Sequence, residues 1–290
     1  MTSSQNWRGL VTEEWQSGFV EANGIRLHYT RTGGDKPPLV LAHGVTDDGL
    51  CWSPVAEALA AEHDAIMVDA RGHGRSDAPE RSYGPAEQAD DLAGVIMSLG
   101  LDRPAVLGHS MGAATALVLA GVYPDLPGAI LLEDPPAWWT DRIDLPGERE
   151  RRARMKEQAS GQKQKTREEL IAGQRAEQPG WSDAELEPWA DAKQRFSPNV
   201  LTVYDQDNGA NIDWRTLLAR ITCPALLITA DPERGAIINE ESAVALKSLV
   251  PHLEIANIPG AGHNIRRDQF ARYMDVIGAF LSESRVGRAS

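Results

Sequence analysis

This sequence of 290 residues contains little cysteine and no long apolar run. Its two cysteines, Cys51 and Cys223, lie far apart and lack the spacing of metal ligands, so reduced structural thiols are expected. No stretch approaches the roughly 18 consecutive apolar residues that a membrane-spanning helix requires. A metal-binding cysteine motif and a transmembrane anchor are therefore not expected.

Basic residues are also fewer than acidic ones, because the sequence has 29 lysines and arginines but 42 aspartates and glutamates, which gives a net charge of -13. An acidic protein repels polyanions, so neither nucleic acid nor an anionic membrane is expected as a partner. Residues 1–16 are polar and lack the basic start and apolar stretch of a secretory signal, which favours a cytoplasmic location. The hydrophobic content of 42% and the length suit one large α/β domain, or one domain with an insertion.

Short apolar runs alternate with helix-forming segments along most of the chain. Buried strands are expected at residues 39–42, 65–68, 105–107, 129–132, 225–229 and 253–258. Helices are expected at residues 52–62, 85–99, 113–120 and 269–282, and a hairpin at 18–30 that turns at Asn23-Gly24. This alternation predicts an α/β fold with a mostly parallel central sheet and helices on both faces.

Residues 137–212 break this rhythm, because they contain charged helical segments and no strong strand. We predict that they form a helical cap inserted into a core of residues 1–136 and 213–290. An insertion at this point would cover the carboxyl edge of the sheet, where ligands bind in open α/β folds. The cap contains several aromatic side chains, namely Trp138, Trp139, Trp181, Trp189, Phe196 and Tyr204. Most are expected to pin the cap to the core, and one or two to face an apolar or aromatic small-molecule substrate.

The segment Gly108-His109-Ser110-Met111-Gly112 is a G-x-S-x-G motif between an apolar run and a helix-forming run. A serine on a sharp strand-to-helix turn has a strained backbone, and the flanking glycines allow close approach of neighbouring chain. Such a turn aims the hydroxyl into the open and places the following N–H groups at a helix N-terminus, which favours an anion. Ser110 is therefore the candidate nucleophile.

A serine hydroxyl needs an adjacent base, and the base needs a carboxylate that orients it. Among the seven histidines, His263 stands out because it lies in a glycine-rich loop between the last predicted strand and the closing helix. That location returns its side chain to the carboxyl edge of the sheet. His109 is next to the serine, but adjacent residues on a tight turn point apart, so a structural role is expected for it.

With these motifs the chain resembles the α/β-hydrolase superfamily, in its lid-bearing serine esterase and lactonase branch. The resemblance covers roughly residues 20–282 and rests on four segments in the family's order: His43-Gly44-Val45, Asp69 to Ser76, Gly108 to Gly112 and Gly260 to His263. It implies a Ser–His–acid triad with Ser110 as nucleophile and His263 as base. It also implies an oxyanion hole formed by the N–H groups of Val45 and Met111, and no metal or organic cofactor.

The acid of the triad can come from two positions in this superfamily. Asp134 follows the strand at 129–132 and precedes a proline pair, which fixes its backbone. The other position follows the strand at 225–229 and offers Asp231 or Glu233, but the segment departs from the family's Gly-x-x-Asp pattern. Asp134 is preferred, and Asp231 and Glu233 remain possible.

The expected activity is hydrolysis of a carboxylic ester or lactone through an acyl-enzyme on Ser110. Haloalkane dehalogenases and epoxide hydrolases of this fold need an aspartate nucleophile, so Ser110 disfavours both. Carbon–carbon bond hydrolase, aminopeptidase and perhydrolase activities remain compatible with a serine. A hydrolase-fold receptor that binds a small ligand with little turnover and a non-catalytic scaffold are rivals from other classes. The oligomeric state is left open.

Overall fold

The computed structural model describes residues 15–140, 147–205 and 211–286, so the expectation for residues 1–16 lies almost entirely outside the described residues. At its centre is an eight-stranded sheet with the strand order β1-β2-β4-β3-β5-β6-β7-β8. The strands are β1 (Gln16–Ala22), β2 (Ile25–Arg31), β3 (Pro38–Ala42), β4 (Asp64–Val68), β5 (Ala105–His109), β6 (Ala129–Glu133), β7 (Ala225–Thr229) and β8 (Glu254–Asn257).

The sheet is antiparallel at one edge and parallel everywhere else. Strands β1 and β2 form a hairpin, and β2 pairs antiparallel with β4, whereas β4, β3, β5, β6, β7 and β8 run parallel. Asn23 and Gly24 turn the hairpin with φ values of 49° and 77°, as a two-residue turn with positive φ at both positions requires. Every residue of β4, β6 and β7 is buried, which is typical of parallel strands covered on both faces. The predicted mostly parallel sheet is confirmed.

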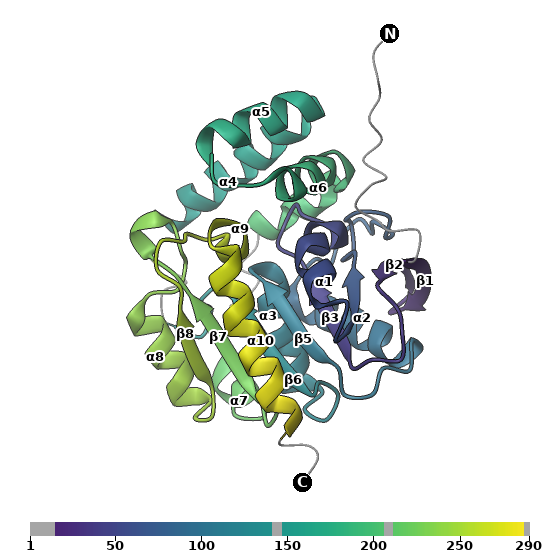
Figure 1. The fold of residues 1–290 in the computed structure, drawn as a ribbon. Helices are drawn as coiled ribbons and strands as arrows, with labels where there is room; N and C mark the ends of the chain where they lie inside the picture. Colours follow the sequence, from purple (N-terminus) through teal and green to yellow (C-terminus); the bar gives the residue numbers. More distant parts are fainter. Residues whose placement is uncertain (1–14, 141–146, 206–210, 287–290) are drawn as a thin grey trace.

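Helices cover both faces of this sheet (Figure 1). Helices α1 (Ser53–Leu59) and α10 (Phe270–Val286) pack on one face, and α2 (Pro85–Ser98), α3 (Met111–Val122), α7 (Trp214–Leu218) and α8 (Glu240–Leu249) on the other. Shorter elements are α9 (Ile265–Asp268) and the 3-10 helices η2 (Gly49–Trp52), η4 (Pro198–Tyr204) and η5 (Pro232–Arg234). Across the described ranges, none of the helices is long and apolar enough to cross a membrane.

Between β6 and α7 the described chain is helical and lies at one end of the sheet (Figure 1). Its helices are α4 (Glu148–Lys163), α5 (Arg167–Glu177) and α6 (Asp183–Arg195). Trp181 donates a hydrogen bond to Asp268, after β8, and Lys193 donates one to the Thr46 carbonyl, after β3. These contacts place the helices over the carboxyl ends of the parallel strands. The division into a core of residues 1–136 and 213–290 and a cap of residues 137–212 stays a prediction.

Candidate active site

Ser110 lies on the sharp turn between β5 and α3. Its φ and ψ are 52° and -112°, a conformation that non-glycine residues adopt only under strain. A Cβ added to Gly108 would meet the backbone of Gly112, and one added to Gly112 would meet the backbone of Ala42. Both glycines of the motif are therefore required by close packing, as predicted.

The hydroxyl of Ser110 is less open than the motif indicates, because the residue is only 7% exposed. The direction of the hydroxyl toward open space stays a prediction. The His263 ring lies against the hydroxyl, and Gly44 packs close to the serine, because an added Cβ would lie 3.5 Å from the Ser110 Cβ. The His263 side chain itself remains 30% exposed, so the imidazole forms the more open side of the site.

A continuous hydrogen-bonded chain joins Ser110, His263 and Asp134. His263 Nε2 lies 3.1 Å from Ser110 Oγ, and His263 Nδ1 lies 2.6 Å from Asp134 Oδ2. Asp134 is fully buried, and its carboxylate also accepts the backbone N–H groups of Ile237 and Ile238 at 2.8–3.0 Å. Because the carboxylate only accepts, it fixes the proton of His263 on Nδ1 and leaves Nε2 free to take the serine proton.

The other two acid candidates do not contact His263. Asp231 Oδ2 accepts the backbone N–H of Gly260 at 2.8 Å, and the Asp231 N–H donates to the carbonyl of Ala261. Asp231 therefore supports the backbone of the histidine loop rather than the imidazole. Glu233 is exposed to solvent in η5. Of the three candidate acids, the structure brings only Asp134 to His263.

Val45, after β3, and Met111, directly after Ser110, are both half-buried. Met111 is the first residue of α3, so its N–H has no acceptor within the helix. The Val45 N–H likewise has no acceptor among the described residues. These N–H groups are thus available for an anion, and their use as an oxyanion hole stays a prediction.

His109 does not face the hydroxyl, in keeping with its expected structural role. Its Nε2 donates to the carbonyl of His263 at 3.0 Å and so supports the loop that presents the imidazole. Burial, reinforced by the neighbouring Arg266 guanidinium, holds the pKa of His109 well below its ordinary value. His109 is therefore neutral at physiological pH.

Residues 39–276 of the chain match the alpha/beta hydrolase family. The chain belongs to this family. It is 32% identical over 271 residues to the N-formylmaleamate deformylase of Pseudomonas putida, across 93% of this chain and 97% of the relative. The family and this relative make the protein a hydrolase.

Two solved structures resemble the hydrolase over most of its length. The N-formylmaleamic acid deformylase from Pseudomonas putida S16 superposes with a TM-score of 0.74 at 28% identity, covering 90% of this chain and all of that one (100%). A thermophilic esterase from Thermogutta terrifontis, with malate bound, superposes with a TM-score of 0.72 at 25% identity and covers 93% of this chain and 99% of that one.

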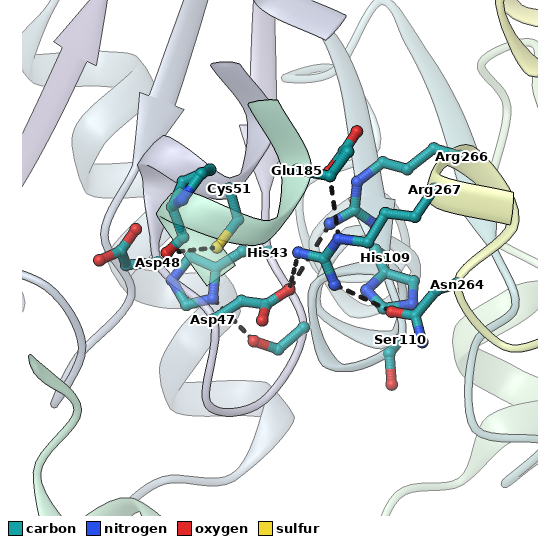
Figure 2. Close-up of polar contacts among 12 residues, drawn as sticks. His43, Asp47, Asp48, Cys51, His109, Ser110, Glu185, Asn264, Arg266 and Arg267 are labelled. Atoms are coloured by element: carbon teal, nitrogen blue, oxygen red, sulfur yellow. Dashed lines mark hydrogen bonds and ion pairs between the residues drawn. The ribbon is translucent and has the colours of Figure 1, made fainter. Parts of the chain in front are cut away.

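Beside the serine, the hydrolase has a cluster of buried charges that the sequence analysis did not single out. It comprises Asp47, Glu133, Glu185, Lys193, Arg266 and Arg267, each at most 4% exposed. We call it the buried charge cluster. Its three acids and three bases balance, which explains how so many charges tolerate burial. Figure 2 shows Arg267 reaching both Asp47 and Glu185, with Ser110 nearby.

The aromatic side chains of residues 137–212 make structural contacts. Trp138 and Trp139 pack against the apolar core, and Trp139 Nε1 donates to the Ser242 carbonyl. Trp181 and Trp189 pack edge to face, and Trp181 Nε1 donates to Asp268 at 2.8 Å. Trp138, Trp139 and Trp181 thus join the insertion to the core, as expected for most of the tryptophans, whereas Trp189 packs with Leu186 inside the insertion.

The two cysteines are both buried and unbridged. Burial, together with the Asp47 and Asp48 carboxylates, raises the pKa of the Cys51 thiol far above its ordinary value, so this thiol is inert at neutral pH. Within the described part of the chain, no group of three His, Cys, Asp or Glu side chains is arranged to hold a metal ion.

Proposed function

We propose that this hydrolase cleaves a carboxylic ester or lactone through an acyl-enzyme on Ser110. The observation that carries the proposal is the unbroken contact from Ser110 Oγ to His263 Nε2 at 3.1 Å and from His263 Nδ1 to Asp134 at 2.6 Å. This arrangement matches the requirements of a serine nucleophile, a general base and an orienting carboxylate. The strained turn at Ser110 adds support, because such strain clusters at functional positions.

In the first step Ser110 Oγ attacks the acyl carbon while His263 Nε2 takes the hydroxyl proton. Asp134 stabilises the imidazolium that forms, and the N–H groups of Val45 and Met111 bind the negative oxygen of the tetrahedral intermediate. The imidazolium then gives its proton to the leaving alcohol, and the acyl-enzyme remains. Water repeats the sequence with His263 as base again and releases the acid. Each step uses only side chains and backbone N–H groups of this chain.

An apolar cluster beside Val45 supports a small apolar or aromatic acyl or alcohol group in the substrate. Val45 packs against an apolar cluster that includes Tyr83, Phe196, Val200 and Leu201, and the half-buried Val203 and Tyr204 also pack against this cluster. Burial raises the pKa of Tyr204 to about 12, so its hydroxyl is neutral there. The substrate class, a cytoplasmic location, and the lack of nucleic-acid and membrane partners are part of this proposal.

An N-acyl amide is the second candidate substrate, and the similarity to N-formylmaleamate deformylase along nearly the whole chain favours it. The same nucleophile and base serve an amide, except that the imidazolium must protonate a poorer leaving group, an amine nitrogen. The deformylase substrate named for that relative is also an anion. A substrate panel should therefore include esters, lactones and formamides, each with and without a carboxylate.

Replacement of the nucleophile tests the proposal directly. Ser110→Ala should abolish turnover of 4-nitrophenyl acetate and labelling by a fluorophosphonate, while thermal unfolding stays close to wild type. Retention of more than a few per cent of the turnover would remove Ser110 from the mechanism. A stoichiometric burst without turnover in the wild type would favour a receptor, and no labelling of Ser110 at all would favour a scaffold.

The matched pair 4-nitrophenyl acetate and 4-nitroacetanilide separates the two substrate classes, because the acyl group is the same and only the leaving atom differs. An ester is intrinsically more reactive than an anilide, so turnover of the anilide is the deciding measurement. An ester hydrolase should turn over the ester and show no measurable turnover of the anilide. Ser110-dependent turnover of the anilide, or preferred turnover of a carboxylate-bearing formamide, would favour the amide candidate.

A further inference from the structure

The turn that follows β3 contains a strained residue beside the proposed oxyanion hole. The Asp47 N–H donates to the Gly44 carbonyl at 3.1 Å, which makes Val45 and Thr46 the central residues of a four-residue turn. Thr46 has a φ of 65°. A positive φ at the third position of such a turn normally calls for glycine, and a β-branched residue is strongly disfavoured there. Contacts from elsewhere in the fold must therefore hold Thr46 in place.

Lys193 on α6 supplies the main contact. Its Nζ donates to the Thr46 carbonyl at 3.1 Å and to Asp47 Oδ1 at 2.8 Å, and the residue is only 3% exposed. The peptide unit that precedes Thr46 is held as well, because the Thr46 N–H donates to His73 Nε2 at 3.4 Å. One buried ammonium group of the insertion thus binds two consecutive residues of the turn.

Asp47 joins this turn to the segment that carries the base. Its Oδ2 accepts from Arg267 at 2.9 Å, and Arg267 also donates to Asn264, the residue after His263 (Figure 2). Burial opposes ionisation of Asp47, but Arg267, Lys193 and Arg266 outweigh it and hold the pKa of this carboxyl well below its ordinary value. The charge that orients Lys193 is therefore permanent at neutral pH.

We propose that Lys193 is a positioning residue for the reaction. It holds the strained Gly44–Asp47 turn, and with it the Val45 N–H, where negative charge develops on the acyl oxygen. The inference rests on the proposed function and adds that the insertion sets the geometry of the oxyanion hole. Donors of this kind stabilise the transition state only when they are fixed at the position of the oxyanion.

Lys163 offers a matched control within the same insertion. Its Nζ donates to the carbonyls of Gln194 and Phe196, so it too is a lysine that binds two backbone oxygens. Both of those oxygens belong to the insertion itself rather than to the turn after β3. Substitution of Lys163 should disturb the insertion without reaching the oxyanion geometry.

Lys193→Met tests the proposal, because methionine keeps an unbranched stem and removes the charge and the donor. We expect kcat for 4-nitrophenyl acetate to fall at least tenfold, KM to change less than about twofold, and fluorophosphonate labelling to slow in parallel with kcat. Lys163→Met should leave kcat within about twofold of wild type. Equal kcat for Lys193→Met and wild type, or equal losses for Lys193→Met and Lys163→Met, would overturn the proposal.

Thr46→Gly in the Lys193→Met background provides the sharper readout. Glycine adopts a positive φ without strain, so the turn no longer needs the lysine and most of the lost kcat should return. A lysine that only stabilised the fold would leave kcat of the double variant as low as that of Lys193→Met. Persistent loss of kcat in a folded double variant would therefore contradict the positioning role.

A pair of substitutions that leaves the net charge unchanged serves as the control for a failure to fold. If Lys193→Met does not fold, Lys193→Met/Asp47→Asn removes one charge of each sign, and Thr46→Gly is added to that background instead. Because Asp47→Asn also weakens the contact with Arg267, kcat should fall at least as far as in Lys193→Met, and Thr46→Gly should recover the part that was lost through the turn. Wild-type turnover that depends on Ser110 but is indifferent to Lys193 would refute this inference alone. Absence of Ser110-dependent turnover would refute the proposed function, and this inference with it.

Discussion

Two neighbouring strand ends carry an aspartate, and they use it differently. Asp134 follows β6 and binds His263 together with the backbone N–H groups of Ile237 and Ile238. Asp231 follows β7, the adjacent strand, and binds the backbone N–H of Gly260. Both carboxylates are anchored by main-chain donors at the same edge of the sheet. Only the first reaches the imidazole.

The difference lies in what the chain does after each strand. The segment after β7 passes η5 and then offers the N–H groups of Ile237 and Ile238 to Asp134, across from its own strand end. Asp231 turns instead toward the loop that carries His263. One strand end thus supplies the side chain that contacts the imidazole, and its neighbour supplies the scaffold for both partners. A carboxylate at a strand end is therefore assigned by its contacts and not by its position in a motif.

Asp134→Asn should produce the largest effect in this comparison, a loss of about 10³- to 10⁴-fold in kcat. The Ile237 and Ile238 N–H groups will draw the amide oxygen of asparagine toward themselves, which leaves its NH₂ group facing His263 Nδ1. His263 must then carry its proton on Nε2 and can no longer accept one from Ser110. Steady-state kinetics with 4-nitrophenyl acetate will measure this loss.

The control for this prediction is Glu233→Gln, because Glu233 is exposed and does not contact His263. Its kcat should match that of the wild type. A loss at Glu233→Gln as large as that at Asp134→Asn would move the acid to the later strand, and near-normal kcat for folded Asp134→Asn would remove Asp134 from the mechanism.

Asp231→Ala should have a smaller effect, roughly a tenfold loss of kcat, because it loosens the loop without changing the imidazole directly. The substitution removes the acceptor of the half-buried Gly260 N–H, which costs about 0.5–1.5 kcal/mol of stability. Asp231→Asn keeps an acceptor oxygen at this place and should restore most of the kcat. Kinetics and urea unfolding of the two variants measure the effect. The assignment of a scaffold role fails if Asp231→Asn loses as much kcat as Asp134→Asn.

Some features of these two strand ends could be predicted from the sequence, and others could not. Strand periodicity, the glycine pattern around Ser110 and the loop at His263 report local or nearest-neighbour constraints, and the structure brings those residues together. The Ile237 and Ile238 donors could not be predicted, because they are backbone N–H groups that the chain brings to Asp134 only in the folded protein. Every residue type except proline offers the same backbone N–H group, so the sequence of this segment does not reveal which N–H groups bind Asp134.

The buried charge cluster was missed for a related reason. Charged residues in an insertion are normally solvated, and their burial depends on how α6 packs against the turn after β3. One signal was available, because Lys193 follows Leu186 and Trp189 on the same helical face, and all three are buried. A lysine at a position where the helical period calls for an apolar residue indicates a buried partner. The identity of that partner, Asp47, follows only from the tertiary packing.

At a third place on this edge of the sheet, neutral side chains take the role that Asp134 and Asp231 play at the other two. Where β3 and the adjacent β4 end, two backbone N–H groups are bound by imidazole rings. His43 Nε2 accepts the Ala70 N–H at 3.0 Å, and His73 Nε2 accepts the Thr46 N–H at 3.4 Å. The opposite nitrogen of each ring donates to a backbone carbonyl, at Gly44 and Arg71 respectively. Protonation would destroy both acceptors, so this strand end should be the one most sensitive to acid.

His73→Asn should therefore make the free energy of unfolding less dependent on pH. Burial, with a contribution from His43, lowers the pKa of His73 to about 3, whereas an unfolded histidine binds a proton below about pH 6.5. The unfolded state thus gains a proton that the folded state does not, and stability falls as pH drops from 6.5 toward 3. One such group changes the free energy of unfolding by about 1.4 kcal/mol per pH unit.

Urea unfolding at pH 7.5 and 5.5 measures this effect. Between these two pH values, the free energy of unfolding should fall by about 1.4 kcal/mol less in the variant than in the wild type. Asparagine can keep the hydrogen bond to the Arg71 carbonyl, and His43 titrates alike in both proteins. An equal or steeper drop in the variant would mean that His73 is not held neutral at this strand end.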